Sequence, residues 1–209
     1  YFAFTLPHFD IQSLWELPVF GALGLVAAAF VLGFIFLVGR IQDFWQRSRV
    51  PMWARPALAG LLLGCIALFH PDILGSGYQS IDQTLNQALL PGALLLLLML
   101  RMLATGAALG SGFAGGVFTP SLVFGAFLGG LVWSAVNVVW PGLLSEHGVY
   151  TIAGMGAVAS AMLGAPISTV LIVFELTANY EVTIAVMLAA AMASTVMQLS
   201  PHTSFFRWQ

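Results

Sequence analysis

Several long stretches of this chain are apolar and carry almost no charge. The clearest of them, Leu17–Val38, contains no Asp, Glu, Lys or Arg. A helix satisfies its own backbone hydrogen bonds, and about 20 apolar residues in a helix are enough to cross a bilayer. Further apolar segments lie at Met52–Phe69, Leu89–Leu109, Phe118–Trp140, Tyr150–Leu163, Pro166–Thr177 and Tyr180–Leu199. The pattern predicts an all-α polytopic membrane protein.

The scarcity of charge excludes most other classes of protein. Only 7% of the residues are charged, whereas a soluble domain carries about 25%. The net charge of −2 offers no basic field, so no nucleic-acid partner is expected. No nucleophile–base pair and no phosphate-binding loop is recognisable in the sequence. We therefore expect neither an enzyme nor a cofactor.

The histidines do not form a metal-binding pattern. They lie at positions 8, 70, 147 and 202, and no H-E-x-x-H motif is present. None has a second His, Cys or carboxylate three or four residues further on, the spacing that would place two ligands on one helical face. We expect no metal site and interpret the histidines as loop residues at the membrane surface.

The apolar segments are unequal in length, and several end at glycine or proline. The chain has 22 Gly and 10 Pro, and irregular backbone inside a membrane is tolerated only where protein or a cavity covers it. Unequal spans with such breaks are typical of a transporter core. Four of the six Arg lie in the connection at 40–55, which the positive-inside rule places in the cytoplasm.

The most informative break is Gly110–Pro120, which contains four glycines before a Thr-Pro pair. Glycines leave room for a ligand beside the backbone. Thr119 is predicted to cap a new helix, with Pro120 at its first position. The first amides of a helix have no partner within it and lie at the positive end of its dipole, so they can bind an anion. Alternatively, the glycines only allow close helix packing.

The segment Gly116–Pro120 resembles the G-x-F-x-P signature of the CLC family of chloride channels and chloride/proton exchangers. Further segments resemble the same family in the same order: Leu14–Pro18, the Arg101-to-Gly116 spacing, Gly154–Ala157, Ala165–Ser168 and Phe174–Tyr180. The resemblance extends over nearly the whole chain but matches only the C-terminal half of a family member. We therefore expect residues 1–209 to form one transmembrane domain, the C-terminal half of a CLC-type pore.

The resemblance implies an inverted-repeat fold with tilted, unequal and re-entrant helices, and it implies chloride as the transported ion. The backbone amides of Val117 and Phe118 would coordinate the anion. The loop and helix start around them would consist of Gly115, Gly116, Thr119 and Pro120. The mechanism would be dehydration of the anion against helix-start amides.

A homodimer is also implied by the resemblance. The helices that match Ser13–Val38, Pro166–Thr177 and Tyr180–Leu199 would contribute to its interface. Their richness in Ala, Val, Leu and Met fits packing against a second subunit and equally fits contact with membrane lipid. The short loops favour a bacterial inner membrane as the location.

Two motifs of the family depart from its pattern here. In family members a tyrosine hydroxyl near the start of the last helix also binds the anion, and Thr203 lies in the matching place. Thr203 either supplies a shorter hydroxyl or leaves that ligand missing. The family's G-S-G-I-P and G-x-E-G-P motifs do not occur in the sequence. Without them, a channel is not distinguished from a proton-coupled exchanger.

Two ionisable residues within apolar segments each have two interpretations. Glu175 is either a functional carboxylate or one held by backbone amides or water at the membrane edge. Arg101 should face protein or water, where it attracts anions or binds a buried partner. Two other functions remain open: another broken-helix secondary transporter, and a non-transporting membrane scaffold subunit.

Overall fold

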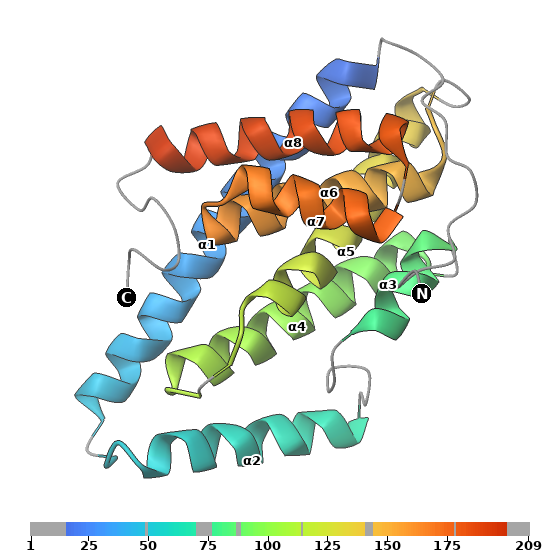
Figure 1. Ribbon diagram of the computed structural model, residues 1–209. Helices are drawn as coiled ribbons and strands as arrows, with labels where there is room; N and C mark the ends of the chain where they lie inside the picture. The colour runs from blue at the N-terminus through green and yellow to red at the C-terminus, as the bar shows by residue number, and fades with distance from the viewer. Residues whose placement is uncertain are drawn as a thin grey trace.

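The computed structural model describes residues 16–48, 50–69, 77–86, 89–113, 115–140, 144–177 and 179–199. Within these ranges every regular element is a helix (Figure 1), which confirms the all-α prediction. The helices are α1 (Leu17–Arg47), α2 (Ala54–Phe69), α3 (Tyr78–Leu85), α4 (Pro91–Gly110), α5 (Phe118–Val139), α6 (His147–Leu163), α7 (Pro166–Thr177) and α8 (Tyr180–Leu199). The bounds of α7 and α8 coincide with the predicted apolar segments.

Helix α1 has 31 residues and is longer than a bilayer requires. Pro18 lies in its first turn, where the missing N–H costs nothing. The residue at the N-cap is Glu16. Beyond the apolar segment that ends at Val38, the helix continues through polar residues as far as Arg47.

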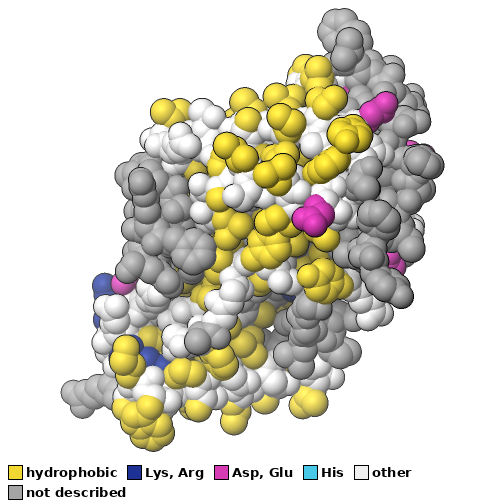
Figure 2. Space-filling view, in the orientation of Figure 1, with side chains coloured by type: hydrophobic (Ala, Val, Ile, Leu, Met, Phe, Trp, Pro, Cys, Tyr) yellow, Lys and Arg dark blue, Asp and Glu magenta, His cyan; other side chains and the backbone are white. Residues whose placement is uncertain are grey.

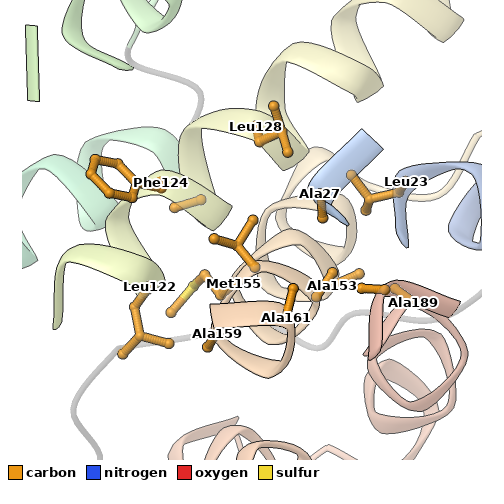
Figure 3. Packing of buried hydrophobic residues seen from close by; sticks show 14 of the residues in the cluster. Leu23, Ala27, Leu122, Phe124, Leu128, Ala153, Met155, Ala159, Ala161 and Ala189 are labelled. Carbon is orange, nitrogen blue, oxygen red and sulfur yellow. The ribbon is translucent and has the colours of Figure 1, made fainter. Parts of the chain in front are cut away.

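Helix α6 lies at the centre of the molecule. Every residue from His147 to Met162 is buried, and the helix contacts α1, α5, α7 and α8. In Figure 3, Ala153 and Ala161 lie toward α1 and α8, whereas Met155 lies toward α5. Because Gly, Ala and Ser are frequent in α6, its neighbours can approach the backbone closely.

The closest packing is between α5 and α6. A Cβ atom added at Gly125 would collide with the carbonyl oxygen of Gly154, and one added at Gly154 would collide with the carbonyl oxygen of Gly125. A turn further along, a Cβ at Gly129 would collide with the carbonyl oxygen of Tyr150. The glycines therefore fix α5 in backbone contact with α6, which in turn fixes where α5 begins.

Four helices of the described residues are long and apolar enough to cross a membrane, namely α1, α4, α5 and α8. Shorter apolar helices accompany them, including α6 and α7. Large apolar side chains are exposed on the outer surface, such as Leu61 on α2 at 70% and Ile167 on α7 at 77%. Figure 2 shows that such side chains cover much of the face in view. An apolar exterior of this kind suits contact with lipid or with further protein.

Charged side chains gather toward opposite ends of the molecule. On the face in Figure 2, Arg side chains lie at the lower left and most acidic side chains lie at the upper right. The lower left is where α1 ends, at Arg40 and Arg47, and where α2 begins, at Arg55. We call this the basic end. Its assignment to the cytoplasmic side stays a prediction from the positive-inside rule.

Candidate functional site

Helix α4 stops at a turn that the glycine-rich sequence makes possible. Ser111 caps the helix, and its hydroxyl donates to the carbonyl of Ala107 at 2.7 Å. Gly112 then adopts a φ of +91°, a left-handed conformation that favours glycine. The Gly112 amide donates to Leu109 and the Phe113 amide donates to Ala108. These two bonds form a Schellman motif, which ends α4 sharply and reverses the chain.

Helix α5 begins where the chain re-enters the molecule. Figure 1 shows that the chain turns back after α4 and that α5 starts inside the outline of the bundle. Val117 is the N-cap residue, and its carbonyl accepts the Ser121 amide at 3.1 Å. No side chain caps the helix. Within the described residues, no group accepts a hydrogen bond from the amides of Val117, Phe118 or Thr119.

The prediction that Thr119 caps the helix and that Pro120 occupies its first position is wrong by two residues. The helix begins at Phe118, so Thr119 and Pro120 both lie within its first turn. Proline is compatible with several first-turn positions, because the first amides of a helix need no intrahelical acceptor. A Thr-Pro pair therefore marks the first turn without fixing which residue is the cap.

The loop in front of these amides is open. Gly115 and Gly116 are exposed, and a Cβ added at either would meet no described atom within 4 Å. The Val117 side chain, in contrast, is only 3% exposed and belongs to the hydrophobic core. The core therefore holds the helix start in place through Val117, while the backbone on its N-terminal side faces free space.

The electrostatics of this site come from the backbone. Helix α5 has 22 residues, so its dipole is fully developed and its N-terminus carries roughly half a positive charge. The six residues from Gly115 to Pro120 include no ionisable side chain. The arrangement offers a small anion partial charges and free N–H donors, without a fixed cation that would hold the anion tightly.

Gly115 and Gly116 form the loop before α5, Val117 is its N-cap residue, and Phe118, Thr119 and Pro120 form its first turn. Anion binding by these residues stays a prediction. The structure does not test the remaining predicted ligand, since Thr203 lies outside the described residues. No group of His, Cys, Asp and Glu that could hold a metal ion occurs in the described part of the chain.

Arg101 faces protein, as one of its predicted alternatives required. The residue is 7% exposed, and a Cβ added at Gly77, just before α3, would collide with its guanidinium. Glu175 is exposed near the end of α7. This position agrees with the interpretation of Glu175 as a carboxylate at the membrane edge. Glu175 is on α7 and is not part of the α5 helix start.

The interpretation of His147 as a surface loop residue is wrong. His147 is the first residue of α6 and is 3% exposed. Its ring packs edge-on against Trp133 at 5.0 Å between centroids, and its Nδ1 lies 3.3 Å from the Thr151 hydroxyl. The sequence did not reveal this burial, because neighbours of the ring come from other helices, Trp133 from α5 and the Thr84 backbone from α3.

The sequence patterns also did not predict a buried cluster of hydrogen bonds around Glu16, which we call the Glu16 cluster. Glu16 is 1% exposed, and its carboxylate accepts hydrogen bonds from three donors. These are the Ser145 amide at 2.9 Å, the Ser145 hydroxyl at 2.8 Å and the Tyr150 hydroxyl at 3.0 Å. The cluster joins the start of α1 to the start of α6. Because three donors hold this one carboxylate in place, we expect its role to be structural.

Helices of membrane length are interspersed with shorter ones, and α5 begins inside the bundle. Such an arrangement is typical of a transporter-like membrane protein. A model of the voltage gated chloride channel family matches residues 1–198. The chain therefore belongs to this family, known as CLC, and the resemblance found in the sequence is confirmed.

Curated relatives support the same assignment. The Ralstonia nicotianae protein named "Putative chloride channel protein ClcB-like" is 36% identical over 89% of this chain and 43% of its own length. The "H(+)/Cl(-) exchange transporter ClcA" of Vibrio cholerae is 32% identical over 93% of this chain and 42% of its own length. The chain thus spans less than half of the length of these two relatives.

Solved structures of the family share the fold. A slow cyanobacterial Cl−/H+ antiporter is similar with a TM-score of 0.86 and 26% identity, over 99% of this chain and 49% of that one. A eukaryotic CLC transporter has a TM-score of 0.71 at 21% identity, over 93% of this chain and 35% of that one. The relatives and structures named here are channels and transporters, and none is named as an enzyme.

Proposed function

We propose that the protein transports chloride across a membrane, as a channel or as a chloride/proton exchanger, and that the helix start at Val117 and Phe118 binds the anion. The observation that carries the proposal is the open loop at Gly115 and Gly116, directly before backbone amides of α5 that have no described hydrogen-bond acceptor. Family membership supports chloride as the ion. The names of the relatives include both channels and exchangers.

The chemistry of the site suits permeation. Chloride must shed water to enter a narrow pathway, and helix-start amides replace some of the lost hydrogen bonds. Conduction also requires that the ion can leave again, which partial charges permit more readily than a full cation. Gly115 and Gly116 add no side chain between the ion and the amides. Thr203 would act as a further ligand at the inner end of the pathway.

The rest of the protein's organisation follows from the same proposal. Residues 1–209 would form one transmembrane domain that corresponds to the C-terminal half of a CLC pore, in the inner membrane of a bacterium. Two copies would assemble, with exposed apolar residues of α7 and α8 such as Ile167, Leu171 and Ile184 in the interface. The transported chloride would be the only small-molecule partner besides membrane lipid, with no cofactor.

Chloride flux tests the function. The full-length protein is reconstituted into liposomes, and efflux of chloride is measured with a chloride electrode, with and without a proton gradient. Efflux that exceeds that of protein-free liposomes is expected. A proton gradient that drives chloride uphill would identify an exchanger, and insensitivity to the gradient a channel. No efflux in either condition would contradict the proposal and would favour a scaffold.

A further inference from the structure

The C-terminal end of α1 forms a small basic pocket. Arg40, Asp43, Phe44 and Arg47 line a cavity of about 320 Å³. Their spacing of three and four residues places all four on one face of the helix. All four side chains are exposed. The pocket lies at the C-terminal end of α1, whereas the Glu16 cluster lies at its N-terminal end.

The pocket carries a net positive charge, and its arginines are not neutralised by ion pairs with its aspartate. The Arg40 guanidinium lies over the Phe36 ring at 4.6 Å from its centroid. Within the described residues, neither Arg40 nor Arg47 forms an ion pair with Asp43. Across the connection to α2, the Arg55 side chain donates to the Val50 carbonyl at 3.2 Å and is not part of the pocket lining. Within the lining, one carboxylate therefore opposes two guanidiniums.

Apolar side chains surround these charges. Phe44 is 66% exposed and belongs to the pocket wall, and Met52 and Trp53 between α1 and α2 are 81% and 82% exposed. Exposed aromatic residues next to arginines are typical of the boundary between hydrocarbon and headgroups. The pocket thus lies where the apolar part of α1 gives way to polar residues, at the basic end of the molecule.

We propose that this pocket binds the phosphate of an anionic phospholipid of the cytoplasmic leaflet, with Arg40 and Arg47 as its ligands. Arg40 and Arg47 lie two helical turns apart on the same face, and their long side chains can converge on a phosphodiester that carries one negative charge. Phe44 on the pocket wall can contact the glycerol and acyl part of a lipid. A free phosphate ion has no such apolar part. Basic pockets at the cytoplasmic ends of membrane helices recognise such headgroups. The inference does not depend on chloride transport.

Lipid binding is measured on the full-length protein. The detergent-purified protein is titrated with phosphatidylglycerol, with phosphatidylcholine and with inorganic phosphate, and bound lipid is counted by native mass spectrometry. Arg40→Gln with Arg47→Gln should weaken phosphatidylglycerol binding roughly 25-fold, from about fivefold for each arginine. Asp43→Asn should strengthen it about fivefold by removing the opposing charge. Gln46→Ala, on an exposed neighbour outside the pocket, is the control and should change nothing.

The gain expected for Asp43→Asn keeps the test decisive even if the double variant folds poorly. Equal binding of phosphatidylcholine would overturn the proposal, because the arginines would then select no charge. Displacement of the lipid by millimolar inorganic phosphate would also overturn it, in favour of a site for a soluble anion. So would phosphatidylglycerol binding that none of the substitutions alters.

Discussion

Gly116 offers the most selective way to perturb the proposed anion site. Its backbone does not adopt a positive φ, and a Cβ there meets no described atom, so Gly116→Ala should fold normally. The added methyl group would occupy the space in front of the α5 amides. We expect chloride binding, measured by isothermal titration calorimetry, to weaken about tenfold, as for loss of one hydrogen bond to a charged group.

The matched control for this substitution is Gly33→Ala. Gly33 is an exposed residue of α1 at which a Cβ likewise meets no described atom. It should leave the affinity for chloride unchanged. If Gly116→Ala bound chloride as tightly as Gly33→Ala, the space in front of Val117 and Phe118 would not be the binding site.

The Glu16 cluster is expected to contribute to stability. Glu16→Ala would leave the buried Ser145 and Tyr150 donors without their acceptor, and buried unsatisfied donors cost about 1–3 kcal/mol each. We expect the free energy of unfolding in detergent to fall by about 3 kcal/mol, read from thermal or denaturant melts. Glu175→Ala removes an exposed carboxylate and should change it by less than about 0.5 kcal/mol. Equal effects of the two substitutions would contradict this role.

Residue types indicated where an anion could bind but not which polar residues are buried. The glycines and the Thr-Pro pair lie next to one another in the sequence, so their joint effect on the backbone could be predicted. Glu16 and its partner Ser145 are 129 positions apart. Nothing in the local spacing of either residue indicates that the fold brings them together.

At the scale of helices, apolar length predicted most elements and local packing decided their ends. The bounds of α7 and α8 were predicted correctly from the apolar segments. Pro166 marks the start of α7, and the polar Asn179 separates α7 from α8. The start of α5 was harder to place. It is fixed by the Val117 side chain in the core and by glycine contacts with α6, and both are properties of the assembled bundle.

The contact between α5 and α6 gives a sharp test at this scale. Gly154→Ala would place a methyl group against the Gly125 carbonyl and force the two backbones apart. We expect the free energy of unfolding to fall by at least about 2 kcal/mol, as for other overpacked cores. Gly64→Ala on α2, where a Cβ meets no described atom, should be neutral or slightly stabilising. A neutral Gly154→Ala would show that the packing is looser than described.

For the whole molecule, the separation of charge predicts a fixed orientation. Gln46 is exposed at the basic end, and Glu146 is exposed before α6 at the other end. In a Cys65→Ala background, a cysteine at position 46 should react with an impermeant maleimide only in inside-out vesicles. A cysteine at position 146 should react in intact cells. Reversed labelling would contradict the assignment of the basic end to the cytoplasm.

Composition alone predicted the membrane class, and co-linear motifs predicted the family. The arrangement around the central α6 was not predictable in the same way, because α6 is apolar on all sides and its pattern does not say which helices cover it. Helices from both ends of the chain, α1 and α8, pack against it. Such contacts between distant segments leave no periodic signal in one sequence.

The central claim is that free amides at the start of α5 bind the transported anion. Bromide replaces chloride and scatters anomalously, so crystals of the full-length protein grown in bromide locate the ion directly. We expect an anomalous peak within hydrogen-bonding distance of the Val117 and Phe118 nitrogens, between about 3.0 and 3.6 Å for a halide. Bromide bound elsewhere in the pathway, with no peak at these two nitrogens, would contradict it.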